Sequence, residues 1–321
     1  MSNDLLNSWG HGARAFALLA AVNRHGWLRF LAEPREQAEV AEFAGLSVER
    51  TGDILEALVA NGVAGRDGDR YRLAASFAEL LDDGAAFDVE AQIEADALRV
   101  RQIADIVGTG SAPATEQDAL VIARSFGLRP VESARGLIPA LLEPMPEVLP
   151  AMREGRYLDV GSGVGGFLLN AAVVHPGVRI TAVERIPAVA AELSRRAKEA
   201  GVEDRVEVRL ADARTLDEAD AYDAAFWAHA FFPAPTRAES LAAVRRALRP
   251  GGWLILQEMV ADSSSEAARA DFALNRLVAH AQELPFSRPA EELAKEAEAG
   301  GFEFVRVVQL PFGRVALLRK P

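Results

Sequence analysis

From about residue 155 to the end of the chain, short apolar runs alternate with longer segments of mixed polarity. Five of the apolar runs have the length of buried strands: Arg156–Val160, Arg179–Glu184, Val206–Leu210, Asp223–Trp227 and Trp253–Gln257. The segments between them have a helical period of apolar positions. This alternation predicts a doubly wound, Rossmann-like α/β domain with a largely parallel sheet.

The last two apolar runs differ from the others because only a short turn separates them. Glu303–Leu310 and Arg314–Leu318 flank the tripeptide Pro-Phe-Gly, which predicts an antiparallel hairpin. The hairpin would complete a mixed sheet of seven strands in which the last strand is reversed. Nicotinamide-binding domains are usually all parallel, so this ending argues against them.

The first part of the chain has a different pattern. Residues 35–44 and 47–61 read as two helices joined by Gly45-Leu46, with Ser47 as the N-cap of the second helix. Asp67-Gly68 then lies between two extended arms, which indicates a hairpin. We therefore predict a mostly helical winged-helix domain over residues 1–80, a helical connector or lid over 81–150, and the α/β domain over 151–321.

Charge and composition limit the classes of partner. The chain of 321 residues has a net charge of −12, which opposes unspecific binding to nucleic acid or to anionic lipid. The second helix of the winged-helix region carries Glu49, Asp53 and Glu56 against Arg50, whereas a helix that reads DNA needs clustered positive charge. We therefore expect no nucleic-acid partner.

The apolar content and the absence of cysteine add further limits. The longest early apolar stretch, residues 15–22, is too short to span a bilayer, and no signal peptide is apparent, so we expect a cytoplasmic protein without a membrane partner. The sequence has no cysteine, which excludes thiolate catalysis and cysteine-bound metals. No histidines and carboxylates share the spacing of a metal site, so we expect no required metal.

The most informative segment is residues 157–166, an apolar strand followed by a glycine-rich turn into a helix. Such a turn lets backbone N–H groups approach a ligand at the N-terminus of a helix. Its glycines fit two patterns. Gly161, Gly163 and Gly166 satisfy G-x-G-x-x-G, the dinucleotide fingerprint, whereas Asp159 with Gly161, Gly163 and Gly165 satisfies D-x-G-x-G-x-G, a nucleoside-binding turn for S-adenosylmethionine (SAM).

Two carboxylates at later strand ends bear on this choice. Glu184 ends the second strand, where a carboxylate accepts hydrogen bonds from ribose hydroxyls of either cofactor. Asp212 follows the third strand, where it can accept from an adenine amino group while the N–H of Ala213 meets a ring nitrogen. Together with the reversed last strand and with Asp159 ahead of the turn, these residues favour SAM.

The chain is thus similar to class I SAM-dependent methyltransferases, in particular to bacterial small-molecule O-methyltransferases with an N-terminal winged-helix dimerisation domain. The resemblance covers essentially the whole chain and includes Pro250-Gly251-Gly252 before the fifth strand. It implies methyl transfer from SAM and a homodimer. It also implies a set of cofactor-binding residues: Asp159, Gly161, Ser162, Gly163, Gly165, Glu184, Arg185, Asp212, Ala213 and Ala228.

The candidate base for the reaction is His229, six residues after the acid of the fourth strand. Methyl transfer is an in-line displacement, so much of its catalysis can come from alignment and the exclusion of water. A base is needed only where the acceptor must lose a proton early. Many members of the family have a histidine further along, where this chain has Phe231 and Phe232. His229 is therefore either the base or a structural histidine beside the cofactor.

The acceptor site is expected beyond the fourth and fifth strands. The residues that we expect to line it are Trp227, Phe232, Phe272, Asn275 and His280. Two consecutive phenylalanines at a strand exit indicate an apolar pocket for a planar small molecule from secondary metabolism. We expect transfer to oxygen first and to carbon or nitrogen next. A homologue that binds SAM without transferring its methyl group, and a SAM-sensing regulator, are the alternatives.

Overall fold

The structure is a computed structural model that describes residues 2–259 and 266–321. Contacts between residues divide the chain into two compact units, Met1–Leu98 and Arg99–Pro321. The predicted division into three functional regions stays a prediction, since the compact units follow contacts and not roles.

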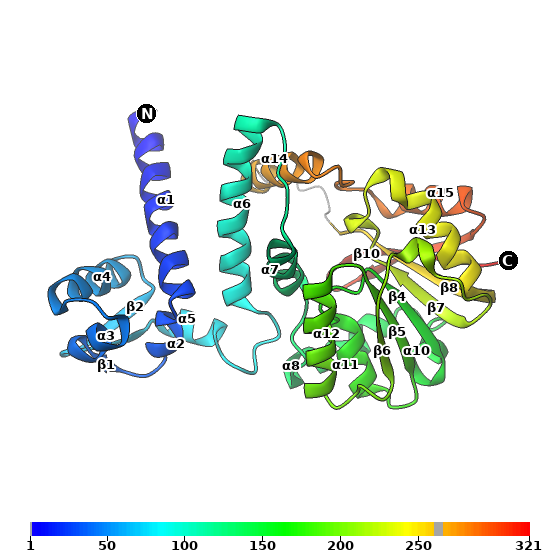
Figure 1. Ribbon diagram of the computed structural model, residues 1–321, viewed down its shortest axis with the longest axis horizontal. Helices are drawn as coiled ribbons and strands as arrows, with labels where there is room; N and C mark the ends of the chain where they lie inside the picture. Colours follow the sequence, from blue (N-terminus) through cyan, green and yellow to red (C-terminus); the bar gives the residue numbers. More distant parts are fainter. Residues whose placement is uncertain (1, 260–265) are drawn as a thin grey trace. The chain divides into compact units, whose positions relative to one another are not determined.

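The first unit consists of helices and a small sheet (Figure 1). Its elements are α1 (Ser2–Arg24), α2 (Trp27–Phe30), β1 (Arg35–Glu36), α3 (Gln37–Ala44), α4 (Val48–Ala60), β2 (Ala64–Asp67), β3 (Arg70–Leu73), α5 (Ala75–Leu80) and the first half of α6 (Val89–Thr109). Strand β3 lies between β1 and β2 and pairs with both in antiparallel register. Apolar side chains that include Leu28, Leu55 and Leu58 form the core of the first unit.

Local capping explains the helical pair of the first unit. The left-handed Gly45 ends α3, and the hydroxyl of Ser47 accepts a hydrogen bond of 3.3 Å from the N–H of Arg50, as the prediction of an N-cap requires. The hairpin predicted at Asp67-Gly68 is confirmed as β2 and β3. The helix predicted over residues 35–44 begins at Gln37, and Arg35–Glu36 form strand β1 instead, because two residues carry too little pattern to reveal a strand.

The second unit contains the remaining helices. They are α7 (Glu116–Phe126), α8 (Glu132–Arg135), α9 (Ile138–Leu142), α10 (Leu149–Glu154), α11 (Gly166–Val174), α12 (Pro187–Glu199), α13 (Ala234–Ala247), α14 (Glu266–Ala281) and α15 (Ala290–Ala299), with the 3₁₀ turns η1 (Ala213–Thr215) and η2 (His229–Phe231). Within the described ranges, none of the helices is long and apolar enough to cross a membrane.

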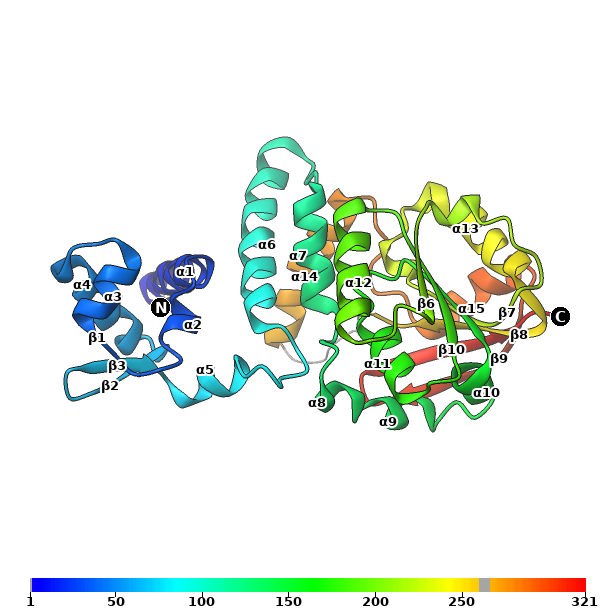
Figure 2. The same ribbon diagram turned by 60° about the horizontal axis from the view of Figure 1, so that its bottom comes forward.

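A sheet of seven strands forms the centre of the second unit (Figure 2). Its strands are β4 (Arg156–Val160), β5 (Arg179–Glu184), β6 (Val206–Leu210), β7 (Tyr222–Trp227), β8 (Leu248–Gln257), β9 (Glu303–Leu310) and β10 (Gly313–Arg319). They lie in the order β6-β5-β4-β7-β8-β10-β9, and β10 runs antiparallel to both of its neighbours. The predicted mixed sheet with a reversed last strand is therefore confirmed.

Strand β8 begins five residues earlier than the pattern of apolar residues indicates. Leu248 already pairs with Tyr222 of β7, before the register shifts and regular pairing resumes at Trp253. The left-handed Gly251, with φ of +77°, lies within this irregular stretch. The pattern missed these residues because Pro-Gly-Gly normally marks a turn and not a strand.

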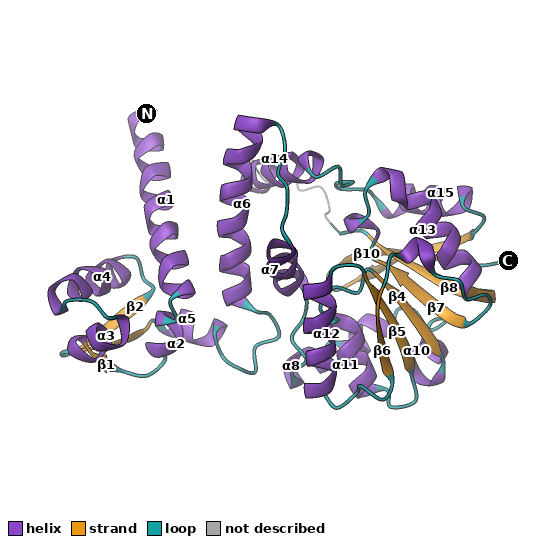
Figure 3. Cartoon of the chain, viewed as in Figure 1, coloured by secondary structure: helices purple, strands orange, loops and turns teal. Residues whose placement is uncertain are grey.

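Helices cover both faces of the sheet, as the secondary-structure colouring of Figure 3 shows. Helices α9, α10, α11 and α12 pack on one face in a core cluster that includes Tyr157. Helices α13 and α15 pack on the opposite face in a second core cluster that includes Leu158. Adjacent strand residues thus contribute to opposite cores, as the pleat of a strand requires. Burial on both faces explains why the predicted strands read as nearly continuous apolar runs.

Candidate functional site

The glycine turn between β4 and α11 is the centre of the candidate site. Gly161, Gly163 and Gly165 have φ angles of +78°, +55° and +76°, a conformation that side chains rarely allow. The N–H groups of Gly161 and Ser162 both donate to the carbonyl of Val183, over 2.9 and 3.2 Å. The turn is therefore tied to the carboxyl end of β5, at the edge where open α/β sheets bind ligands.

Gly161 also allows the exit of β7 to approach the turn. A Cβ atom on Gly161 would lie 2.9 Å from Cε2 of Phe232 and 3.2 Å from Cβ of Ala228. Two residues predicted for different parts of the site, Ala228 for the cofactor and Phe232 for the acceptor, thus meet at the same glycine. The structure places Phe232 where the two predicted sites adjoin.

Glu184 lies at the end of β5, and its carboxylate holds the turn. One oxygen accepts from the N–H of Gly163 over 3.1 Å, and the other accepts from the N–H of Ile186 over 2.9 Å. The side chain is buried, while the next residue, Arg185, is exposed. Each carboxylate oxygen keeps a further lone pair, so Glu184 can still accept from a ligand hydroxyl.

Asp159 is a buried acid directly below the turn. Only 6% of its surface is exposed. Burial raises the pKa of Asp159 to about 7, the hydroxyl of Ser162 opposes this shift, and the negative charge of Glu184 adds to it. A cationic group of a ligand would stabilise the ionised form of a carboxyl group in this position.

Asp212 follows β6 and forms the N-cap of η1. Its carboxylate binds the guanidinium of Arg214 through two contacts of 3.0 and 2.8 Å, which lowers the pKa of Asp212. The positive charge of Arg185 acts in the same direction. The N–H of Ala213 donates no hydrogen bond within the described residues, so it is available to a ligand.

His229 is buried at the exit of β7. Its Nε2 lies 2.7 Å from the carbonyl oxygen of Gln257, so this nitrogen carries a proton and donates it. Burial, together with the charges of Arg237 and Arg288, lowers the pKa of His229 to about 4, although the hydrogen bond with Gln257 acts in the opposite direction. Nδ1 is buried and has no partner among the described residues. The ring is thus neutral near pH 7, and these contacts favour the structural role. Its role as a base stays a prediction.

The residues expected to line the acceptor site lie on two elements. Trp227, at the end of β7, packs its ring 5.5 Å from that of Phe232. On α14, Phe272 packs 4.8 Å from Phe286, and Asn275 donates to the side chain of Asp271 over 2.9 Å. His280, near the end of α14, is exposed. The structure therefore brings Phe232 to the glycine turn. Trp227 is fully buried in the core that α13 and α15 cover, so it packs behind Phe232 and does not line an open acceptor site as predicted. The roles of Phe232 and of the α14 residues stay predictions.

Residues of the connector also reach the glycine turn, which the sequence patterns did not predict. A Cβ atom on Gly166 would lie 2.4 Å from the backbone nitrogen of Leu128, and one on Gly163 would lie 3.9 Å from Cβ of Ala123. The side chain of Asn170 donates to the carbonyl of Arg129 over 3.1 Å. Helix α7 and residues 127–129 therefore cover one side of the turn.

Phe126 extends this cover toward the exit of β7. Its ring lies 5.9 Å from the ring of Phe231 in an edge-to-face arrangement. The aromatic pair connects α7 to η2, so apolar side chains from both elements border the same region. Sequence spacing could not reveal this contact, because about one hundred residues separate its two members.

Comparisons of the sequence with known proteins agree with this geometry. Residues 158–252 match a family described as "Methyltransferase domain". The N,N-dimethyltransferase OxyT of Streptomyces rimosus is 30% identical over 113 residues, which cover 35% of this chain and 32% of OxyT. The chain thus matches about a third of the length of this curated relative.

Solved structures match over the whole chain. The mitomycin 7-O-methyltransferase MmcR has a TM-score of 0.77 at 20% identity, and the match covers 100% of this chain and 98% of MmcR. Human N-acetylserotonin methyltransferase, solved in complex with SAM, has a TM-score of 0.74 at 19% identity, with the same coverage of 100% and 98%. At these identities the likeness shows a shared fold.

Proposed function

We propose that this chain, which contains a class I SAM-dependent methyltransferase domain, transfers a methyl group from SAM to a small organic acceptor. The family match over residues 158–252 and the shared fold support this resemblance. The observation that carries the proposal is the glycine turn with a buried acid below it and a second acid at its side, Asp159 and Glu184.

The residues around the turn fit this cofactor. Asp159 is buried, and no basic group contributes to the shift of its pKa. Its carboxyl group therefore suits the α-ammonium group of the methionine part of SAM. Glu184 suits the ribose hydroxyls, and Asp212 with the free N–H of Ala213 suits the adenine edge. Since Arg214 already binds Asp212, an adenine amino group would share that carboxylate with it.

SAM supplies an activated methyl group, and the residues of this chain supply its alignment. The turn holds one end of the cofactor, while the ring of Phe232, backed by the fully buried ring of Trp227, forms an apolar wall at the exit of β7. Apolar cover excludes water from the reacting atoms and restricts the acceptor to a productive orientation. The same wall suits a planar or apolar acceptor of the secondary-metabolite kind.

The acceptor atom depends on whether a base is present. His229 uses Nε2 as a donor and is neutral, so it is a weak base in the described arrangement. An amine needs no base before it attacks a methyl group, whereas an alcohol or a phenol does. Oxygen was the first expectation from the sequence, but these contacts favour an amine nitrogen. OxyT is named an N,N-dimethyltransferase, and MmcR is named an O-methyltransferase.

We further propose that the chain acts as a homodimer through its first unit. On α1, the apolar side chains Leu5, Leu6 and Trp9 are exposed by 56%, 66% and 69%. Apolar side chains gathered on one helix are typical of a surface that another protein chain covers. Light scattering after gel filtration would give twice the mass of 34.5 kDa if the proposal holds.

Calorimetry with SAM and S-adenosylhomocysteine (SAH) tests the cofactor site. We expect Glu184→Ala and Asp212→Ala each to weaken binding by about ten-fold or more, as the loss of a charged hydrogen-bond acceptor implies. Glu207→Ala is the control, because that acid lies on β6 and pairs with Arg209. Unchanged affinity in both site variants would contradict the assignment.

A second experiment separates transfer from binding alone. The protein is incubated with methyl-labelled SAM and a panel of aromatic amines and phenols, and the formation of SAH and of labelled product is measured. Turnover of amines above phenols supports the amine proposal, and the reverse order contradicts it. Tight binding of SAM with no turnover of any panel member favours a homologue that uses the cofactor without transferring its methyl group.

A further inference from the structure

Arg237 on α13 is a buried arginine that is not among the site residues described above. Only 6% of its surface is exposed. Its Nη1 donates to the carbonyl of His229 and lies 3.5 Å from the carbonyl of Phe232, so it binds both ends of η2. Its Cζ atom lies over the ring of Trp227, at 4.9 Å from the centroid. One side chain thus contacts three residues at the exit of β7.

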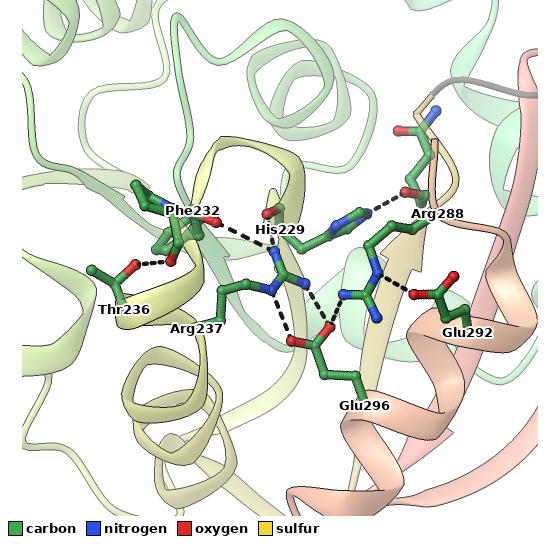
Figure 4. A network of polar contacts seen from close by, with 9 residues as sticks. His229, Phe232, Thr236, Arg237, Arg288, Glu292 and Glu296 are labelled. Atoms are coloured by element: carbon green, nitrogen blue, oxygen red, sulfur yellow. Dashed lines mark hydrogen bonds and ion pairs between the residues drawn. The ribbon is translucent and has the colours of Figure 1, made fainter. Parts of the chain in front are cut away.

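The other edge of the Arg237 guanidinium binds Glu296 of α15. Nε donates to one carboxylate oxygen over 2.8 Å, and Nη2 donates to the other. Arg288 binds the same carboxylate from the opposite side and also pairs with Glu292. Figure 4 shows Glu296 between the two guanidinium groups and the η2 turn beyond Arg237.

The charges within this group balance in favour of an ionised Glu296. Burial alone would raise the pKa of Glu296, but the hydrogen bonds and charges of Arg237 and Arg288 lower it. Arg237 is buried and Glu296 is partly buried. Such an ion pair contributes little net stability, because the cost of removing its charges from water offsets their attraction. Its value therefore lies more in the geometry that it fixes than in the free energy of unfolding.

The geometry that it fixes is that of Phe232. The carbonyl of Phe232 faces Arg237, and its ring faces the other way, onto Gly161 of the glycine turn. Only a guanidinium can donate to a carboxylate and to backbone carbonyls at once within one plane, since its five N–H groups are fixed in direction. A lysine ammonium, whose three N–H groups diverge from one nitrogen, could not bind both oxygens of Glu296 in parallel and keep the contacts with the carbonyls.

We propose that Arg237 is a positioning residue that, held by Glu296, seats the Phe232 ring against Gly161 and thereby sets the affinity of the site for SAM. The inference rests on the proposed function, because it assumes that SAM occupies the glycine turn. Phe232 is the group through which Arg237 acts, and Glu296 is the group that fixes the direction of Arg237. Neither role requires Arg237 to touch the cofactor.

A double-mutant cycle on SAM affinity tests the proposal. We measure the Kd of SAM by calorimetry for Arg237→Lys, Phe232→Leu and the double variant. Arg237→Lys should raise the Kd by about ten-fold, the size of effect typical of coupling between residues of one contact network. In the Phe232→Leu background the same change should raise it by less than about two-fold, because coupled residues are not additive.

Arg306→Lys is a matched control. Arg306 of β9 also binds a carboxylate through two contacts, both of 2.9 Å to Glu147, and a backbone carbonyl, that of Pro144 at 2.8 Å. It contacts neither η2 nor the glycine turn through these bonds. The control variant should therefore share any general cost of replacing a paired arginine while leaving the Kd of SAM unchanged.

Glu296→Gln is the second variant, and it serves where Arg237→Lys does not fold. It keeps the size of the side chain and the charge of Arg237 but weakens the hold on the guanidinium, so the Kd should rise in the same direction. Wild-type affinity in either folded variant overturns the proposal, and so do independent effects of Arg237→Lys and Phe232→Leu. If the wild-type protein itself does not bind SAM, the proposed function fails, which is a separate result.

Discussion

Replacing Asp159 with asparagine tests the electrostatics of the glycine turn without a change of shape. The wild-type carboxyl is buried below the turn, where burial raises its pKa from 3.8 to about 7. The folded protein therefore keeps the proton of Asp159 up to near pH 7, whereas the unfolded chain loses it near its ordinary pKa. The amide of an asparagine does not titrate in this pH range, so its contribution to the free energy of unfolding would not depend on pH.

The sign and size of the effect follow from the two pKa values. Between about pH 4 and pH 7 the folded state binds more protons than the unfolded state, so stability falls as the pH rises. At 1.36 kcal/mol per pKa unit, the ionised carboxyl costs the folded protein about 4 kcal/mol at pH 8. Asp159→Asn removes this cost, and its advantage over the wild type should grow by roughly 2–3 kcal/mol from pH 5 to pH 8.

Chemical denaturation at the two pH values measures this difference. Two of the four tryptophans, Trp227 and Trp253, lie in the second unit with Asp159, so Trp9 and Trp27 are replaced by phenylalanine and the fluorescence reports that unit. The free energy of unfolding is then compared between this background and the same background with Asp159→Asn. An equal gap at pH 5 and pH 8, or an asparagine variant that is less stable at pH 8, would refute the reasoning.

The same residue should link cofactor binding to proton release. A bound α-ammonium group favours the ionised carboxyl, so SAM binding at pH 6 should drive a proton from Asp159. Calorimetry in two buffers with different ionisation enthalpies measures this proton directly. The wild type should release close to one proton, and Asp159→Asn should release none and bind SAM less tightly. The asparagine variant would thus gain stability and lose function, as is common at binding sites.

Two further predictions concern other parts of the site. The imidazole of His229, with a pKa lowered to about 4, should stay neutral with its proton on Nε2 down to pH 5. NMR of labelled histidine measures this protonation state, and a ring that titrates near 6.5 would contradict the burial argument. Gly166→Ala should destabilise the second unit by about 1–3 kcal/mol, because the new Cβ atom would clash with the backbone of Leu128, which can move away only at a cost in free energy. Gly108→Ala in α6, where a Cβ atom meets nothing within 4 Å, is the control and should have no such cost in the same denaturation experiment.

Much of the fold could be predicted because the second unit is regular. A sheet buried on both faces gives apolar runs that stand out from the helices between them, and the start of β9 at Glu303 and its end at Leu310 match the prediction. The glycine turn was equally accessible, because left-handed positions such as Gly161 have few alternatives to glycine. Strand ends then placed Glu184 and Asp212 at the same edge.

The rest of the candidate site depends on contacts between distant segments. The approach of Leu128 to Gly166 and of Phe126 to Phe231 leaves no periodic pattern in either segment. The neutral state of His229 is set by burial and by a carbonyl of β8, so its position after β7 could not reveal it. Arg237 was missed for a similar reason, because a buried arginine resembles any other helical arginine until its partners are known.

The contact of residues 127–129 with the start of α11 has a consequence for how the protein can be divided. A fragment that starts at residue 151 would contain every residue of the glycine motif, yet it would lack the backbone that fills the space beside Gly166. Asn170 would also lose the carbonyl of Arg129 as an acceptor. An excised or grafted module that keeps the glycine turn intact therefore has to begin ahead of α7 and carry residues 116–130 along with the sheet.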